Sequence, residues 1–362
     1  MSKSRVPIKI TTTLVFILGC FLPHKLFAQL KQTQFNGFGH VEYSLTHKDS
    51  TNSYFTLGEH DFFITSNLSN RISFLGEYVI RYEPTTSFFR PSIERSFVRF
   101  NYTNNHNFIV GKIHTPVNYW NDVYHHGRVF FPVIDRPLSF SYMVPLHTLG
   151  IQMQGQNLGK LDFGYDVVLG NGIASSDIFQ SGINPALTAA FHIKPLPGMR
   201  IGASYYYNYL QENVTGTHVG HSIARSVPSK LYKGPVDFQL FSGSFAWFAK
   251  RFELLNEFSF NQSRTDSLGT ANNLANFTYI GYRFNDYNVP FLLVDYLKIA
   301  DNDIHVYPAE LLKTAVGYRY EFNYLVNLKA QLEYTWTKHA GNNLIHEHQR
   351  TLGFRLQLAY GF

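Results

Sequence analysis

The chain of 362 residues contains one cysteine, few charged residues, and no long hydrophobic run after its first 28 residues. The single cysteine, Cys20, excludes an intramolecular disulfide framework. Charged residues make up only 15% of the sequence. Because no run of about 18 apolar residues follows residue 28, we expect no transmembrane helix in that part of the chain.

The first 28 residues have the pattern of a secretory signal peptide. A basic start precedes the apolar stretch 14–22, and Ala28 ends a small-residue cleavage site. The alternative is lipoprotein processing at Cys20, but the two residues before it fit a lipidation site poorly. We therefore expect residues 1–28 to be removed and residues 29–362 to form one exported domain.

The formal charge is small once this segment is removed. The whole chain carries +6, and removing four lysine or arginine residues with the signal lowers this to about +2. This balance gives no argument for a nucleic-acid partner. Aromatic residues reach 17%, yet the mean hydropathy is −0.16. An exported chain that is aromatic but not hydrophobic overall suits a β-barrel whose inner face is polar.

Alternation of apolar and polar residues is the main structural signal. In the stretch 350–362 every second position is apolar or aromatic, which is typical of a strand with one apolar face. These positions are Leu352, Phe354, Leu356, Leu358, Tyr360 and Phe362. The stretch 326–336 shows the same pattern.

Alternation and turn residues together predict sixteen strands of roughly ten residues each. The predicted ranges are 37–46, 54–65, 71–82, 95–102, 107–113, 149–156, 161–169, 187–193, 201–209, 238–248, 252–260, 273–284, 290–299, 311–322, 326–336 and 350–362. Seven short connections alternate with eight longer ones. Hydrocarbon offers no partner for free backbone groups, so a sheet that crosses it must close on itself. We predict an all-β, transmembrane antiparallel β-barrel of 16 strands, with a soluble β-sandwich or barrel as the alternative.

The end of the chain resembles the closing strand of bacterial outer-membrane β-barrels, because the aromatic alternation runs to a terminal Phe362. The stretch 111–120 (GKIHTPVNYW) and the following 124–128 (YHHGR) resemble porin-like outer-membrane proteins of Bacteroidota. This resemblance implies a Gram-negative outer membrane, contact with its lipid, long extracellular loops, short periplasmic turns and a homotrimer.

The longest connection runs from His114 to His147. Its place as the third long connection resembles the loop of sixteen-stranded porins that folds into the channel and narrows it. A surface loop is the alternative. On the first interpretation, the residues predicted to line the constriction are Tyr119, Trp120, Asp122, His125, His126, Arg128, Asp135 and Arg136.

Four arginines share the inward parity of a predicted hairpin, and such a cluster attracts anions. They are Arg71, Arg81, Arg95 and Arg99, and they resemble a feature of phosphate-selective porins. Acidic residues also have inward parity: Glu42, Glu77, Glu253, Glu257 and Glu333. We therefore favour the mixed-charge wall of a general porin and keep phosphate selectivity as the alternative.

The histidines gather in the predicted loops. His218 with His221, and His346 with His348, have spacings that a metal could use, but we interpret the loop histidines as solvated and predict no metal or cofactor. Asp122 with His125, and Asp135 with Arg136, form no recognisable catalytic motif, so we do not expect an enzyme.

These observations predict an outer-membrane porin for passive diffusion of small hydrophilic solutes or ions. A non-conducting barrel that acts as a scaffold or as an outer-membrane enzyme is the alternative from another class.

Overall fold

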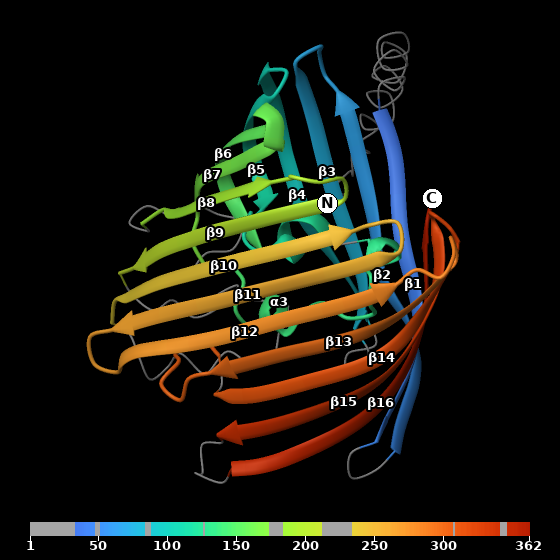
Figure 1. Cartoon of the computed structure of the whole chain (residues 1–362). Helices are drawn as coiled ribbons and strands as arrows, with labels where there is room; N and C mark the ends of the chain where they lie inside the picture. Colours follow the sequence, from blue (N-terminus) through green and yellow to red (C-terminus); the bar gives the residue numbers. More distant parts are fainter. Residues whose placement is uncertain are drawn as a thin grey trace, which may run out of the picture.

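The computed structural model describes residues 33–47, 51–83, 88–125, 127–173, 184–211, 234–306, 308–340 and 346–362. They form sixteen strands in one closed antiparallel sheet (Figure 1). The predicted signal peptide, residues 1–28, lies outside the described residues. Within the described ranges no helix is both long and apolar enough to cross a membrane.

Each strand is hydrogen-bonded to the next one in the chain, and β1 is bonded to β16. The strands are β1 (Thr33–His47), β2 (Thr51–Asn67), β3 (Ile72–Glu83), β4 (Phe88–Thr103), β5 (His106–His114), β6 (His147–Leu158), β7 (Phe163–Gly170), β8 (Ala186–Ile193), β9 (Met199–Leu210), β10 (Val236–Phe248), β11 (Phe252–Thr265), β12 (Gly269–Tyr282), β13 (Asn288–Ile299), β14 (Ala309–Asn323), β15 (Val326–Ala340) and β16 (His346–Gly361). All sixteen predicted strands are confirmed.

The barrel closes where β1 meets β16. Gly37 and Phe362 exchange two backbone hydrogen bonds of 2.9 Å, and the pairing continues to His47 opposite Leu352. A Cβ atom at Gly37 would lie 2.4 Å from the Phe362 ring, so a larger residue there would require the exposed ring of Phe362 to move. Closure satisfies the backbone groups that an open sheet edge would leave without partners.

The outer face of the barrel is apolar, as the alternation predicts. Its large side chains are between 39% and 54% exposed at Phe100, Val110, Met153, Leu169, Leu292 and Leu332. A belt of apolar side chains around a closed sheet exceeds the scattered apolar residues of an ordinary soluble surface. It matches the face that a transmembrane barrel presents to lipid.

The two ends of the barrel differ in their connections. The turn end, where β2 leads to β3 and β4 to β5, carries seven connections of two to five residues. The loop end carries the long ones, but four of its eight connections are as short as those of the turn end, which the sequence did not predict. Three residues separate β1 from β2 and β11 from β12, four separate β3 from β4, and five separate β15 from β16, because these strands extend further than the alternation indicated. Likewise Pro91 lies within β4, opposite Ile80, and not in a loop.

The inner face is not uniform. In β13 the inward residues are apolar except Asp295, and Val289, Phe291 and Leu293 are at most 3% exposed. The outward residues Leu292 and Val294 are 54% and 46% exposed, so both faces of this strand are apolar and the burial pattern fixes which of them faces inward. An apolar inward face needs a partner inside the barrel, because water in the lumen would not stabilise it.

Candidate functional site

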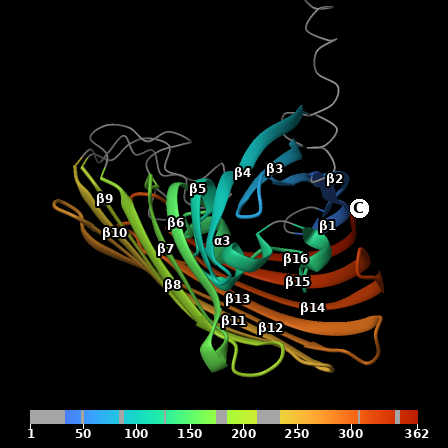
Figure 2. The same cartoon turned by 90° about the horizontal axis from the view of Figure 1, so that it is seen from above.

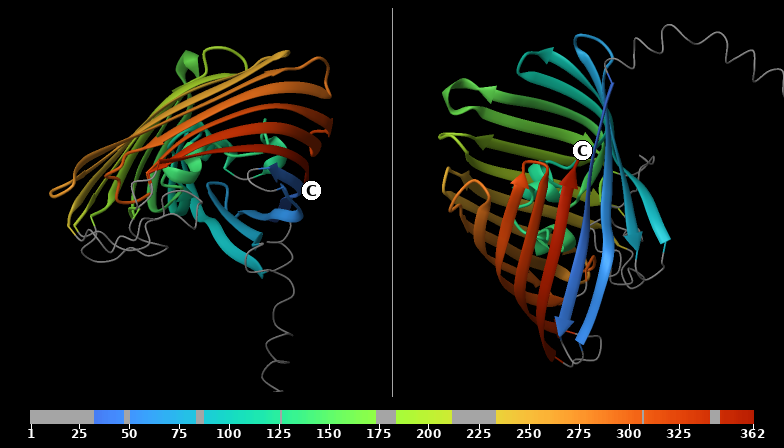
Figure 3. Two further views of the ribbon diagram at one scale, coloured as in Figure 1. Left: turned by 90° about the horizontal axis from the view of Figure 1, so that it is seen from below. Right: turned by 90° about the vertical axis from the view of Figure 1, so that its right-hand side faces the viewer.

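The connection between β5 and β6, residues 115–146, lies inside the barrel, and we call it the inner loop. It carries the short helices η1 (Trp120–Tyr124), η2 (Arg128–Phe130) and α3 (Leu138–Tyr142). Figures 2 and 3 show α3 within the outline of the strands. Most of the inner loop is buried, since Val117, Phe131 and Val133 have no exposed surface.

One side of the inner loop packs on apolar side chains of β9 to β14. Trp120 is 1% exposed and makes edge-to-face contacts with Tyr124, Phe131 and Phe277, with ring centroids 5.1 to 5.2 Å apart. The wall contributes further buried residues to this cluster: Tyr206, Phe238, Leu240, Leu255, Phe291, Leu293 and Leu297. Trp120 therefore anchors the inner loop, in contrast to its predicted place on the lining of an open pore.

Polar groups fix the orientation of the same contact. Asn118 has a left-handed backbone conformation, with φ 63°, and its amide donates to Glu257 Oε1 and to Ser259 Oγ, both at 2.7 Å. The backbone N–H of Trp120 donates to Glu257 Oε2 at 2.9 Å. Glu257 is 2% exposed, which confirms its predicted inward direction. A buried carboxylate with several donors fixes the position of the segment that supplies them.

The opposite side of the inner loop is held by charged groups. Glu59 of β2 accepts two hydrogen bonds from Arg136, at 2.8 and 3.1 Å. Glu59 also pairs with Arg81 of β3 at 2.8 Å, and Arg128 lies 3.8 Å away. The Arg136 guanidinium lies 5.5 Å from the centre of the Phe131 ring. Bidentate arginine–carboxylate pairs fix geometry as well as charge.

A second anchor lies at Asp135. Its carboxylate accepts from Lys313 of β14 at 2.9 Å and pairs with Arg355 of β16. Arg355 also contacts Glu42 of β1. The inner loop is therefore tied to the wall on both sides of the barrel closure.

These contacts change how the loop groups titrate. Burial by itself raises the pKa of Asp135, but Arg355 and Lys313 outweigh it and hold that pKa well below its usual range. Burial, reinforced by the nearby Arg136, lowers the pKa of Arg128 to about 10. Both groups remain charged near neutral pH.

The four arginines predicted on the lumen wall are placed differently from one another. Arg81 pairs with Glu59, and Arg95 pairs with Glu77, which has no exposed surface. Arg99 has its guanidinium 5.6 Å from the centre of the Phe97 ring. Arg71 differs from the prediction, because β3 begins at Ile72 and Arg71 lies in the exposed turn before it.

Tyr119 and Asp122 face the turn end of the barrel. Asp122 pairs with Arg200 of β9 at 2.5 Å, and the Arg200 guanidinium lies 5.2 Å from the centre of the Tyr119 ring. These three residues line a cavity of about 690 Å³ that reaches the turns before β7 and β9. A second cavity of about 380 Å³ lies beside Arg283 and Arg319 at the turns before β13 and β15.

Of the remaining predicted loop residues, His125 is 2% exposed and lies at the neck of the inner loop. His126 lies outside the described residues. Sequence analysis missed Glu59, Lys313 and Arg319 as partners. The alternation along each strand showed that these side chains point inward, but it does not show which part of a loop a side chain will contact.

No protein-family model matches the chain, and no curated protein matches it. Among solved structures, it is similar to the anion-selective porin from Comamonas acidovorans, with a TM-score of 0.64 and 10% identity, covering 91% of this chain and 99% of that chain. It is also similar to OprB of Pseudomonas putida, with a TM-score of 0.61 and 12% identity, covering 93% and 96%. It is similar as well to the trimer form of OmpT of Vibrio cholerae, with a TM-score of 0.60 and 11% identity, covering 91% of this chain and 99% of that chain.

These likenesses concern the fold. The chain is a closed antiparallel barrel of sixteen strands, nearly all β, of the architecture found in outer-membrane porins.

Proposed function

We propose that the protein is an outer-membrane porin whose channel is narrowed by the inner loop and passes small hydrophilic solutes or ions. The apolar belt supports contact with outer-membrane lipid, because water would not solvate such a face well. Sixteen strands enclose a lumen wide enough for water, unlike eight-stranded barrels. We also infer that residues 1–28 direct export and that the likeness to Bacteroidota porins reflects shared descent.

The observation that carries this proposal is the fixed position of the inner loop. A loop that only covered the surface would not need Glu59, Asp135 and Glu257 as anchors on three sides. A barrel whose lumen was completely plugged would not leave cavities of about 690 and 380 Å³ beside that loop. A fixed segment with space beside it fits a constriction better than a complete plug.

We favour a mixed-charge channel over a phosphate-selective one. Two of the predicted anion-attracting arginines, Arg81 and Arg95, pair with glutamates on the neighbouring strand. Such pairs neutralise much of the field that would otherwise concentrate anions. The anion-selective neighbour supports the channel architecture, and its selectivity belongs to its own side chains.

Single-channel recording in planar bilayers tests this function. We expect steady ohmic steps, and a reversal potential in a salt gradient that shifts away from anion preference in Arg99→Ala and by less in Arg95→Ala. Arg71→Ala is the matched control, because it removes the same charge from the exposed turn. Absence of conductance steps from the folded protein would overturn the proposal. An equal shift in all three variants would show that Arg99 does not face the permeating ions.

We propose further that the barrel forms a homotrimer and has no catalytic role. The trimer form of the Vibrio cholerae neighbour supports the first point. Light scattering of the detergent-solubilised protein tests it, and a mass of one chain would contradict it. Lipid or peptide hydrolysis by the purified barrel would contradict the second point.

A further inference from the structure

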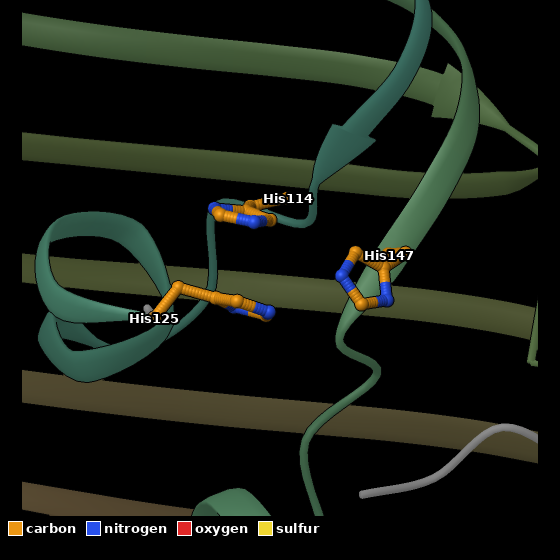
Figure 4. Close-up of side chains that lie close together, drawn as sticks. All are labelled: His114, His125 and His147. Atoms are coloured by element: carbon orange, nitrogen blue, oxygen red, sulfur yellow. The ribbon is translucent and has the colours of Figure 1, made fainter. Parts of the chain in front are cut away.

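Three histidines from separate parts of the sequence meet at the neck of the inner loop. His114 ends β5 and His147 begins β6, and the two face each other in the last rung of that strand pair. His125 follows η1 and returns to the same place from inside the barrel. Figure 4 shows the rings of His114 and His125 one above the other, with the His147 ring beside them.

The rings are close enough to share one ion. One nitrogen from each lies within 4.8 Å of the nitrogens from the other two. The centroids of His114 and His125 are 3.6 Å apart at an interplanar angle of 17°, and those of His125 and His147 are 4.8 Å apart at 64°. The cluster is well shielded from solvent, since His125 is 2% exposed and the His114 side chain 9%.

We propose that His114, His125 and His147 bind a divalent transition-metal ion of the zinc, nickel or copper class. Neutral imidazole is the preferred side-chain ligand of these ions. Three histidines with a remaining position for water or a carboxylate form a common ligand set for zinc. Metal–nitrogen bonds of about 2.0–2.1 Å place such nitrogens roughly 3.3 Å apart, so binding requires the nearly parallel rings of His114 and His125 to rotate until their lone pairs converge on the ion.

The surrounding groups suit a cation. Glu94 Oε2 lies 2.9 Å from His147 Nε2, and Glu77 Oε2 lies 3.6 Å from His114 Nε2. Both separations are close to those between neighbouring ligand atoms on one ion, so Glu94 is the candidate fourth ligand, and Glu77 adds negative charge that its pair with Arg95 partly offsets. Hard cations such as calcium are disfavoured, because they require mostly oxygen ligands.

A hydrogen bond prepares His125 for this role. Its Nδ1 lies 2.6 Å from Asn121 Oδ1, and an amide oxygen only accepts, so Nδ1 carries the proton. The lone pair then lies on Nε2, the nitrogen that can bind metal. Asn121 is itself held by its amide, which donates to the backbone carbonyls of Thr115 and Leu146 at 2.6 and 3.1 Å. Partners of this kind orient metal-binding histidines.

The position of the site gives the ion a structural consequence. His114 and His147 flank the two ends of the inner loop, and His125 belongs to its first helical segment. One ion would therefore join both ends to the interior and limit movement of the loop at its neck. This inference does not depend on solute transport.

Isothermal titration of the metal-free, detergent-solubilised full barrel with ZnCl₂ tests the site. We expect one zinc ion per chain, and an affinity at least about 100-fold lower in His125→Asn, since even outer partners cost about 10–100-fold. Glu94→Gln should lower it by about 10–100-fold. His106→Asn is the control, because His106 contacts Tyr165 at the turn end. The double variant His346→Asn and His348→Asn removes the histidine pair that the sequence suggested for a metal, and so distinguishes zinc bound there from zinc bound at the proposed site.

Two outcomes would overturn the site. One is wild-type protein without saturable zinc binding. The other is folded His125→Asn that binds zinc as tightly as wild type. X-ray absorption of zinc-loaded wild-type protein keeps the test independent of variant folding, because three imidazole ligands are expected and fewer than three would contradict the assignment. Protease cleavage within residues 115–146 should also become faster when a chelator removes the metal.

Discussion

The two sides of the barrel interior hold the inner loop by different physical means. From β9 to β14 the inward residues include a buried apolar cluster, against which Trp120 and Phe131 pack, beside polar groups such as Glu257. On β1 to β4 and β16 the inward residues are charged, and Glu59 and Arg355 pair with the inner loop.

The apolar side mainly stabilises the docked inner loop, whereas the charged side mainly sets the electrostatic field in the lumen. Burying an aromatic side chain removes about 150–250 Å² from water and is non-directional, so the apolar side supplies most of the docking free energy. Ion pairs contribute less free energy, because each group loses hydration. They fix the position of the inner loop and leave charge beside the path of ions in the proposed channel. Changes on the apolar side should therefore alter channel size, and changes on the charged side should alter ion preference.

Trp120→Ala should have the largest effect. Truncating a buried tryptophan costs about 3–5 kcal/mol, which is enough to release much of the inner loop from its seat. We expect a larger and noisier single-channel conductance. Phe241→Ala is the control, because Phe241 is 45% exposed on the outer face. Unchanged conductance in Trp120→Ala would show that the apolar side does not hold the loop.

Glu59→Gln should have a smaller effect on conductance and a clear effect on selectivity. It removes the carboxylate that Arg81, Arg128 and Arg136 approach, and breaking such a buried pair costs about 3–5 kcal/mol. We expect the reversal potential to move toward anion preference. Glu310→Gln makes the same charge change at the hydroxyl of Tyr296, away from the inner loop, and should leave selectivity as in wild type.

Asp135→Asn should show the smallest effect, and one that depends on pH. The pKa of Asp135 is lowered by Arg355 and Lys313, so its contribution to stability is fully present above 3.8, the ordinary value, and is lost as pH falls through the lower folded-state pKa. In urea unfolding, the gap between wild type and variant should be constant from neutral pH to about pH 5 and shrink in stronger acid.

The exposed Asp286 offers the control for that experiment. Asp286→Asn should leave the unfolding free energy close to wild type throughout. If the gap produced by Asp135→Asn instead stayed constant below pH 3, the ion pairs with Lys313 and Arg355 would not be its source.

Alternation and turn residues together were sufficient to predict all sixteen strands, most of which have one apolar outward face. The inward glutamates were readable from the same parity, and Glu42, Glu77, Glu253 and Glu257 are all at most 5% exposed. The apolar inward face of β13 was also visible, as a strand with two apolar faces.

The contacts of the inner loop could not be predicted. Irregular backbone has no period from which to infer which side chains face inward. The sequence therefore placed Trp120 on the pore lining, whereas in the structure it packs against the wall and anchors the loop. The histidine cluster was missed for the same reason. His114 and His147 meet only because β5 and β6 pair, and His125 reaches them only because η1 turns back toward the neck.

The position of the inner loop can be measured directly with two introduced cysteines in a Cys20→Ser background. Asn118 of the inner loop and Ser259 of β11 are in direct contact, with 2.7 Å between amide nitrogen and hydroxyl oxygen. In Asn118→Cys combined with Ser259→Cys, a short bifunctional thiol reagent should link the two positions in the folded barrel. Failure to cross-link, with the thiol introduced in the inner loop instead labelled by a bulky reagent from outside, would place the loop on the surface and contradict the account.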